Sequence, residues 1–350
     1  MYGDGTPISI GPEELNLLRN ILSKSLNGKQ LLIMEAIQRT KGESLHRILH
    51  RISESHGIPL STLKFHSNIL LELGLIEKVL SNGRKRVRVS RLGRKLLMIL
   101  NGSKVDEDVE VPESIDSLSM ELKIRLIEFL KRINGFHLGS SLSTLNILIA
   151  IFTYRQLTNK SITSTKLVLS KGHAAPALYI VLNHLGVIND EILRDAFSCD
   201  SIIQTHPIKN CPTVVFSSGS LGQGISIANG LAIKMEMDRD YDDIYVILGD
   251  GELDEGQVWE ALATSSSKGL DNILLFIDRN GKQLSGATEE VKRKEPLADK
   301  LRSFGWEVFE VDGSKPSNIL KKIFISKCLA GWPKAIIVHT SKEIQGIGMR

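Results

Sequence analysis

The segment GDGELDEGQVWEALATSSSKGLDNILLFIDRNGKQLSG (Gly249–Gly286) decides the fold of the larger part of this chain. Two apolar runs, IYVILG (244–249) and NILLFIDR (272–279), have the length and composition of buried strands, and a helical pattern lies between them. A further run of the same kind is AIIVHT (335–340). Strands that alternate with helices are typical of a parallel sheet. The sequence therefore predicts an α/β fold whose parallel sheet is covered by helices on both faces.

Polar residues follow two of these predicted strands at the point where each strand ends. Asp250 comes directly after the first run, and Asn280 comes directly after the second. In a right-handed βαβ unit both residues reach the carboxyl edge of the sheet, where open α/β folds bind ligands. A carboxylate, an amide oxygen and a backbone carbonyl suit Mg²⁺ and leave coordination positions for a diphosphate. Gly249 and Gly251 would let the backbone approach that diphosphate closely.

Charge is distributed unevenly along the 350 residues, although the formal net charge is only +4. Residues 1–104 contain 17 Lys or Arg and 8 Asp or Glu, a net charge of +9, whereas residues 105–350 contain 27 and 32, a net charge of −5. A Gly, Pro, Ser and acid-rich segment at 105–117 is predicted to be a linker. We therefore expect two domains, 1–104 and 118–350, whose surfaces meet different partners.

Cysteine content and hydropathy indicate the compartment. The chain has three cysteines without a C-x-x-C spacing, a pattern that indicates neither a disulfide framework nor a zinc site and that fits a reducing cytoplasm. The longest apolar run, Leu145–Phe152, is much shorter than the roughly 20 residues needed to span a membrane. We expect a soluble cytoplasmic protein without a membrane segment.

The basic first domain has the order of elements of a winged helix-turn-helix. Helical spacing of apolar residues covers Leu15–Leu26, Lys29–Arg39 and Ser44–Ser55, and Ser61 is predicted to cap a further helix that ends at Gly74. The next stretch, LIEKVLSNGRKRVRVSRLG (75–93), alternates around an Asn-Gly and predicts a hairpin.

This order suggests DNA binding through residues 44–95. The hairpin region carries cations that could hold phosphates, namely Arg84, Lys85, Arg86, Arg88, Arg91, Arg94 and Lys95. In the predicted recognition helix, the candidates for the groove-facing side are Ser61, Thr62, Lys64 and His66. Winged helices also serve as protein-protein modules, and a charged hairpin is often only a solvated surface. DNA binding and docking of a partner subunit both remain open. The later run Glu289–Lys294 is interpreted as a solvated helix face.

Three blocks in the second domain resemble the transketolase family in the same order: LSKGHAAPALY (169–179), SSGSLGQGISIANGLA (217–232) and GDGELDEGQVWEAL (249–262). The stretch from Gly-Asp-Gly to Asn280 resembles the thiamine diphosphate motif of that family, and the resemblance covers roughly residues 118–340. It implies a thiamine diphosphate-binding, transketolase-like domain preceded by the small winged helix domain. It also implies a transferase that moves a two-carbon ketol unit between sugar phosphates, with thiamine diphosphate and Mg²⁺ as cofactors.

The resemblance also assigns roles to single residues. Asp250, Asn280 and the main-chain carbonyl of Lys282 would ligate Mg²⁺, and Gly251 would touch the diphosphate. The residues that would line the cofactor are Ser140, His173, Gly219, Ser220 and Leu221. His137 would face the sugar, and the residues expected to act in catalysis are His137, His173 and Glu255. Glu255 and Glu260 match carboxylates at the subunit contact of the family.

Full-length members of the family continue into a pyrimidine-binding domain, which this sequence does not show before Arg350. We therefore expect the N-terminal subunit of a split transketolase that acts with a separate C-terminal subunit, homodimerises and forms a symmetric heterotetramer. Phe136 stands where the family usually has glycine, and the match of Lys342 to a phosphate contact is interrupted by extra residues. The alternative function is a transcriptional regulator that uses a catalytically silent transketolase-like domain to sense thiamine diphosphate or sugar phosphate.

Overall fold

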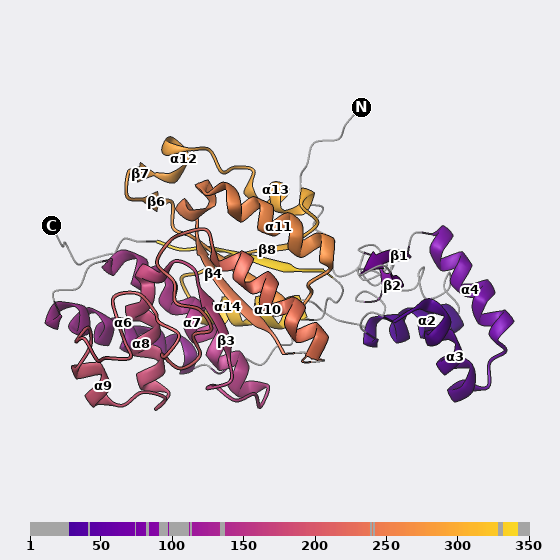
Figure 1. Cartoon of the computed structure of the whole chain (residues 1–350), viewed down its shortest axis with the longest axis horizontal. Coiled ribbons are helices and arrows are strands. Elements are labelled where there is room, and N and C mark those ends of the chain that lie inside the picture. Colours follow the sequence, from indigo (N-terminus) through magenta and orange to yellow (C-terminus); the bar gives the residue numbers. More distant parts are fainter. Residues whose placement is uncertain are drawn as a thin grey trace. The chain divides into compact units, whose positions relative to one another are not determined.

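The computed structural model describes residues 28–40, 43–73, 75–81, 84–90, 97, 112, 114–133, 137–238, 240, 242–327 and 332–341. The chain divides into two compact units, one of residues 1–108 with 329–331 and one of residues 109–328 with 332–350 (Figure 1).

The smaller unit consists of three helices and a hairpin around an apolar core. The elements are α2 (Gly28–Arg39), α3 (Leu45–His56), α4 (Leu60–Glu72), β1 (Ile76–Ser81) and β2 (Arg84–Val89). The two strands are antiparallel, with Ile76 opposite Val89. Ile33, Ile48 and Leu63, one from each helix, are buried together in this core. The predicted helices and hairpin are confirmed, except that Leu15–Leu26 lies outside the described residues.

The prediction that Ser61 caps helix α4 is wrong. The helix begins at Leu60 after Pro59, and no side chain caps it. The backbone of Pro59, with φ −55° and ψ 134°, ends the extended segment at the first helical residue, so Ser61 lies within the first turn. A serine does cap the preceding helix, because Ser44 Oγ accepts a hydrogen bond from the Arg47 amide at 3.4 Å.

The larger unit is built on a five-stranded sheet in the order β3-β4-β5-β9-β8. The strands are β3 (Lys166–Leu169), β4 (Ile244–Gly249), β5 (Ile273–Arg279), β8 (Glu307–Asp312) and β9 (Lys334–His339), and every neighbouring pair is parallel. The α/β fold and the three strands expected from the apolar runs are thus confirmed. Because Gly249 is in register with Asp278, β4 and β5 end side by side at the carboxyl edge.

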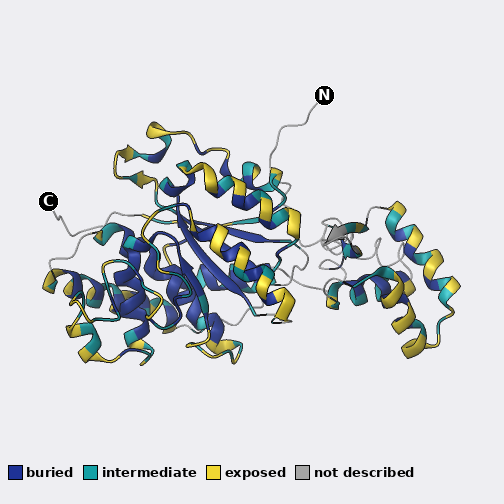
Figure 2. Cartoon of the chain, in the orientation of Figure 1, coloured by how far each residue is buried: buried dark blue, intermediate teal, exposed yellow. Residues whose placement is uncertain are grey.

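Helices cover both faces of this sheet, since alternate strand residues point to opposite sides. Tyr245 and Ile247 pack in one core with helices α6 (Ser114–Arg132), α7 (Leu138–Leu157), α8 (Ala175–His184) and α14 (Pro316–Lys327). Ile244, Val246 and Leu248 pack in a second core with α10 (Gly224–Asp238), α11 (Gly256–Lys268) and α13 (Leu297–Ser303). The strands are accordingly buried between two helical layers (Figure 2).

Short elements carry the loops at the ends of the strands. They are η1 (Gly172–Ala174), α9 (Asp190–Arg194), η2 (Gly251–Asp254), β6 (Lys282–Gln283), β7 (Gly286–Ala287) and α12 (Thr288–Val291).

The predicted linker 105–117 is too long at its carboxyl end, because α6 begins at Ser114. Asp116 lies in the first turn of α6, where an acid is favourable, and its carboxylate accepts hydrogen bonds from Ser317 N at 3.1 Å and Ser317 Oγ at 2.9 Å. These bonds fasten the start of α6 to α14. The run Leu145–Phe152 is a buried part of α7, and none of the helices described is both long and apolar enough to cross a membrane.

Candidate functional site

The carboxyl ends of β4 and β5 bring Asp250 next to the loop that contains Asn280 and Lys282. Asp250 is 1% exposed. The amide of Gly281 donates a hydrogen bond to Asp250 Oδ2 at 2.7 Å, and the amide of Gly251 donates one to Oδ1 at 2.9 Å. Asn280 and Lys282 flank Gly281, and the Lys282 amide donates to Asn280 Oδ1 at 3.1 Å. The three predicted metal ligands therefore belong to one compact turn at the sheet edge.

The chemistry of this donor set fits a divalent cation bound together with a diphosphate. The set consists of one carboxylate, one amide oxygen and one backbone carbonyl, which are hard oxygen ligands. The backbone at Gly251 is close to the same turn, since a Cβ placed there would lie 2.9 Å from Gln283 Cβ. Glycine is therefore required at this position, as expected for a backbone that a diphosphate approaches.

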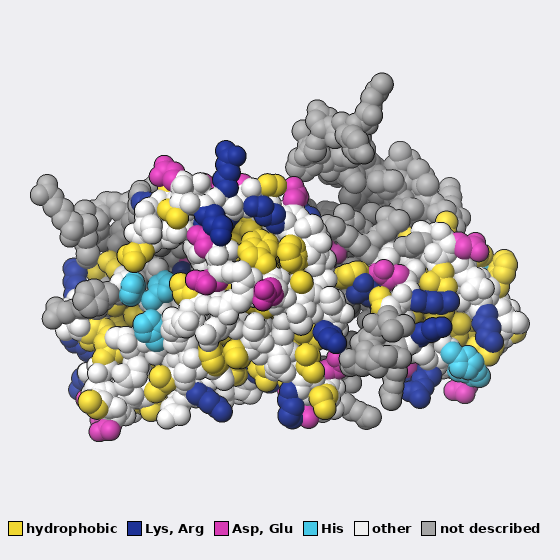
Figure 3. Space-filling view, turned by 45° about the horizontal axis from the view of Figure 1, so that its top comes forward, with side chains coloured by type: hydrophobic (Ala, Val, Ile, Leu, Met, Phe, Trp, Pro, Cys, Tyr) yellow, Lys and Arg dark blue, Asp and Glu magenta, His cyan; other side chains and the backbone are white. Residues whose placement is uncertain are grey.

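A group of histidines lies at the start of α7 and the end of β3. His173 Nε2 lies 3.2 Å from Ser140 Oγ, and the His137 and His173 rings are 5.1 Å apart between centroids. His137 has a left-handed backbone with φ 65° immediately before α7, a conformation uncommon for a residue other than glycine. Histidine side chains gather on one face of the larger unit in Figure 3. The structure thus brings His137, Ser140 and His173 together.

His206 belongs to this region as well, and the sequence interpretation missed it. A Cβ placed on Gly172 would lie 3.1 Å from His206 Cδ2, and one placed on Gly219 would lie 3.9 Å from the same atom. His206 therefore lies between the turn of His173 and the Gly-Ser-Leu turn at 219–221. The available signal was its His-Pro dipeptide between the two blocks, but no spacing rule connects such a dipeptide with a site.

Glu252 ties the two glycine-rich turns together. Its buried carboxylate accepts hydrogen bonds from Gly222 N at 2.7 Å, from Gly249 N at 3.1 Å and from the Ser170 hydroxyl. Burial raises the pKa of Glu252, although these donors oppose the shift. The turn 219–221 is fixed further where Gln257 Nε2 donates to the Leu221 carbonyl at 3.1 Å. Gly219 and Ser220 remain exposed to solvent in this turn.

Asp278 connects the remaining segments beneath the site. Its carboxylate accepts hydrogen bonds from Ser143 Oγ at 2.6 Å and Thr144 Oγ1 at 3.2 Å, both in α7, and forms an ion pair with Lys171. Burial on its own would raise the pKa of Asp278, but the Lys171 ammonium and the hydroxyl donors hold it below its usual value. The start of α7, the turn of His173 and the end of β5 are thereby held in one arrangement.

Glu255 and Glu260 lie elsewhere on the larger unit. Glu255 precedes α11, Glu260 lies within that helix, and both are exposed. None of the contacts among the described residues joins either acid to the histidines or to Asp250. Their exposure leaves them available to another chain.

The run Glu289–Lys294 is not a solvated helix face, so that interpretation is wrong. Glu289 accepts a hydrogen bond from Arg279 Nη2 at 2.6 Å, and Lys294, only 2% exposed, pairs with Asp254 Oδ1 at 2.9 Å. Arg279 also donates from Nη1 to Asp250 Oδ2 at 3.1 Å. The run closes over the predicted metal-binding turn. Sequence patterns gave no sign of it, because Asp254 and Arg279 lie far from their partners along the chain.

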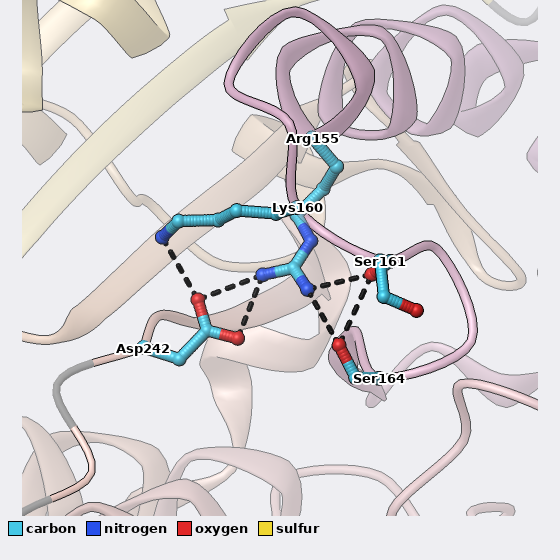
Figure 4. Close-up of a pocket in the computed structure, with 5 residues that line it drawn as sticks. All are labelled: Arg155, Lys160, Ser161, Ser164 and Asp242. Atoms are coloured by element: carbon cyan, nitrogen blue, oxygen red, sulfur yellow. Dashed lines mark hydrogen bonds and ion pairs between the residues drawn. The ribbon is translucent and has the colours of Figure 1, made fainter.

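A pocket of about 360 Å³ lies away from all of these residues, lined by Arg155, Lys160, Ser161, Ser164 and Asp242 (Figure 4). Arg155 Nη1 bonds to both oxygens of Asp242 at 2.7 and 2.8 Å, and Lys160 Nζ reaches the same carboxylate at 2.8 Å. Because these residues precede β3 and β4, the pocket lies at the amino ends of the strands, opposite Asp250. Its cations are paired within the chain, so it is a structural charge network.

Comparison with known proteins agrees with the geometry. Residues 117–348 match the family described as transketolase, thiamine diphosphate binding domain. One of the two subunits of the apulose-4-phosphate transketolase of Phocaeicola vulgatus is 34% identical over 234 residues, covering 66% of this chain and 83% of that protein. The 6-deoxy-6-sulfo-D-fructose transketolase subunit SqwG of a Clostridium species is 35% identical over 221 residues, covering 62% and 80%.

Solved structures show the same relationship. The transketolase of Campylobacter jejuni superimposes with a TM-score of 0.59 at 25% identity over 66% of this chain. The match covers only 38% of that transketolase, so this chain spans well under half of the single-chain enzyme. The family match shows that thiamine diphosphate, with a divalent metal, is the cofactor of this domain. This chain belongs to the transketolase family and is a transketolase-like transferase chain of the kind that carries the thiamine diphosphate-binding domain.

Proposed function

We propose that this protein is the N-terminal subunit of a split transketolase, which transfers a two-carbon ketol unit between sugar phosphates together with a separate C-terminal subunit. The observation that carries the proposal is the turn in which Gly281 holds Asp250 beside Asn280 and Lys282. The names of the two bacterial relatives as transketolase subunits support it. They also suggest that phosphorylated or sulfonated sugars other than those of the pentose phosphate pathway should be included among the candidate substrates.

The residues then have the following roles. Asp250, Asn280 and the carbonyl of Lys282 hold Mg²⁺, and Gly251 gives the diphosphate access to the backbone. The thiazolium ring of thiamine diphosphate supplies the nucleophilic carbon that accepts the ketol unit. Its surroundings are formed by Ser140, His173, Gly219, Ser220 and Leu221. His137 faces the sugar, and together with His173 it can orient hydroxyl groups and move protons at their oxygens.

Assembly with other subunits completes the site. We infer that a pyrimidine-binding C-terminal subunit supplies the other wall of the cofactor site. We also infer that two copies of this chain pair through a surface that includes Glu255 and Glu260, giving a heterotetramer with twofold symmetry. Both acids are exposed in the single chain, as a contact surface requires. When they are buried against a second copy, one of them can retain a proton at neutral pH.

The test is ketol transfer by the complex that accompanies tagged protein from its own cells. The assay offers xylulose 5-phosphate as donor and ribose 5-phosphate, apulose 4-phosphate and related sugars as alternative reactants, with thiamine diphosphate and Mg²⁺ present. Activity with any pair that is lost in Asp250→Asn and kept in Asp299→Asn supports the proposal. Lack of transfer with every pair by a complex containing a pyrimidine-binding subunit would refute it.

We propose as a second function that the smaller unit binds duplex DNA through α4. Ser61, Lys64 and Asn68 are exposed along one side of this helix with the spacing of a single face. Lysine and asparagine pair well with guanine and adenine edges in the major groove. Thr62 and His66, two of the residues predicted to face the groove, are only half-exposed. Figure 3 shows Lys and Arg side chains on the visible face of this unit.

The predicted basic hairpin contributes less free charge than its composition suggests. Arg88 Nε pairs with Glu77 Oε1 at 3.0 Å across the two strands, whereas Lys85 is exposed. The side chain of Arg84, and Arg91, Arg94 and Lys95, lie outside the described residues. Phosphate contacts from the hairpin therefore rest on Lys85 and the partly exposed Arg86.

DNA binding is tested with a pool of random duplexes at several salt concentrations. Selection of a preferred sequence that Lys64→Ala and Asn68→Ala weaken, while Lys268→Ala on the larger unit does not, supports readout by α4. Each lost base contact should cost about 1–3 kcal/mol. Binding that is equally weak on all sequences would reject specific recognition and favour a docking module for the partner subunit.

The alternative function, a transcriptional regulator with a transketolase-like sensor domain, requires both properties in one molecule. Thiamine diphosphate or a sugar phosphate would have to change the affinity for the selected duplex, as coupling between two sites demands. Measuring that affinity with and without each ligand decides between them. An unchanged affinity in a complex that transfers ketol units leaves the enzyme as the function.

A further inference from the structure

The two carboxylate oxygens of Asp250 are used unequally. Oδ2 accepts hydrogen bonds from Gly281 N at 2.7 Å, Arg279 Nη1 at 3.1 Å and Thr288 Oγ1 at 3.4 Å. Among the residues that the structure describes, the donor to Oδ1 is the Gly251 amide at 2.9 Å. Oδ2 is therefore occupied by donors of the chain itself, while Oδ1 keeps an electron pair free for a cation.

Arg279 is the charged member of this set, and it is held rigidly. Its side chain is 9% exposed. Nη1 donates to Thr288 Oγ1 at 2.8 Å as well as to Asp250, and Nη2 donates to Glu289 at 2.6 Å and to Glu295 at 3.1 Å. The planar guanidinium bonds in two directions at once, so its position relative to Asp250 is fixed from the far side. A lysine has no such fork and could not make all of these bonds together.

The surroundings of Arg279 prevent it from simply repelling a cation. Three carboxylates, those of Asp250, Glu289 and Glu295, contact the single guanidinium. Their combined negative charge exceeds its positive charge, so the position of Oδ1 stays attractive to a cation. The effect of Arg279 on a bound metal therefore acts through the orientation of Asp250.

The chemistry of the two common divalent cations makes this orientation consequential. Mg²⁺ requires a nearly ideal octahedron of oxygens and takes few protein ligands, whereas Ca²⁺ accepts six to eight ligands and often binds both oxygens of one carboxylate. We propose that Arg279 is a positioning residue that restricts Asp250 to ligation through one oxygen and thereby sets the preference of the site for Mg²⁺ over Ca²⁺. This inference rests on the proposed function, in which Asp250 ligates the metal of the cofactor.

The test measures the affinities for Mg²⁺ and Ca²⁺ separately. Each cation is titrated by calorimetry into the full-length protein, purified with the subunit that accompanies it and saturated with thiamine diphosphate. Arg279→Lys keeps the charge but loses the fork. Glu289→Ala releases one side of the guanidinium without altering Asp250 or Arg279. Arg302→Lys is the matched control, because Arg302 pairs with Asp299 at 2.8 Å in a surface helix pair away from the site.

Arg279→Lys should shift the ratio of the two dissociation constants toward Ca²⁺ by about tenfold or more, the size typical for residues that orient metal ligands. Glu289→Ala should shift it in the same direction by less, and Arg302→Lys should leave it unchanged. An unchanged ratio in Arg279→Lys, with melting preserved, overturns the inference but not the metal site. If that variant does not fold, an unchanged ratio in Glu289→Ala overturns it. A wild-type complex that binds neither cation overturns the proposed function and this inference together.

Discussion

Lys171 and Asp278 form an ion pair that is almost completely shielded from solvent, with side-chain exposures of 1% and 0%. Lys171 lies in the turn that carries His173, and Asp278 lies at the end of the strand that leads to Asn280. The pair therefore links the histidine side of the site to the metal-binding side. A buried ion pair is costly to desolvate, so its contribution is to fix the arrangement of these segments more than to stabilise the fold.

The energetics of this pair can be tested by a double-mutant cycle. Lys171→Met leaves the Asp278 carboxylate buried without its cation and should lower the free energy of unfolding by about 3–5 kcal/mol. Lys171→Met combined with Asp278→Asn should recover much of that loss, because no unpaired charge remains. Urea unfolding followed by tryptophan fluorescence reports on the larger unit, which contains Trp259, Trp306 and Trp332. Equal losses in the single and double variants would contradict the coupling.

Two glycines in helix α10 should respond in opposite ways to substitution by alanine. A Cβ on Gly224 would lie 2.4 Å from Ser170 Cβ, so Gly224→Ala should force α10 away from β3 and cost about 1–3 kcal/mol. A Cβ on Gly230 would meet nothing within 4 Å, so Gly230→Ala should stabilise the unit by up to about 1 kcal/mol through helix propensity. Thermal melting of both variants checks the pair, and a stabilising Gly224→Ala would disprove the close approach.

Asp250→Asn should remove the stabilisation that the cofactor gives to the protein. The amide keeps the size of the side chain but lacks the charge that attracts a divalent cation, and one of its two polar atoms would face an N–H donor. The melting temperature of the wild type should rise when thiamine diphosphate and Mg²⁺ are added together, since ligands stabilise the state that binds them. That rise should disappear in Asp250→Asn and persist in Asp299→Asn. A full rise in Asp250→Asn would remove this residue from the metal site.

The sheet and the place of the metal-binding turn could be predicted from sequence because both depend on local patterns. Apolar runs such as 244–249 and 272–279 specify buried strands, and parallel strands bring the residues that follow them to a common edge. The expectation that Asp250 lies beside the loop of Asn280 therefore needed no knowledge of distant contacts.

Other parts of the site depend on contacts that no local pattern encodes. Arg279 and Glu289 are ten residues apart, but both belong to the site only because the hairpin of β6 and β7 folds the run 289–294 back onto Asp250. His206 reaches the histidine group through a long loop between α9 and α10. The cap at Ser61 was misplaced because proline and serine compete as signals for the helix start, and Pro59 prevails.

The charge network at the amino edge of the sheet predicts how the stability of the larger unit depends on pH. Burial alone would raise the pKa of Asp242, but hydrogen bonds from Arg155 and Lys160 hold it well below its usual value. Because the folded pKa is lower than the unfolded one, this carboxylate stabilises the fold at neutral pH, and the contribution is lost as the pH falls below about 4. Asp242→Asn should therefore be less stable than the wild type by about 1–3 kcal/mol at pH 7, and the difference should shrink steadily toward pH 3. Asp238→Asn, which alters an exposed pair with Lys234, should show almost no difference at either pH, and a constant difference for Asp242→Asn across the range would contradict the proposed linkage.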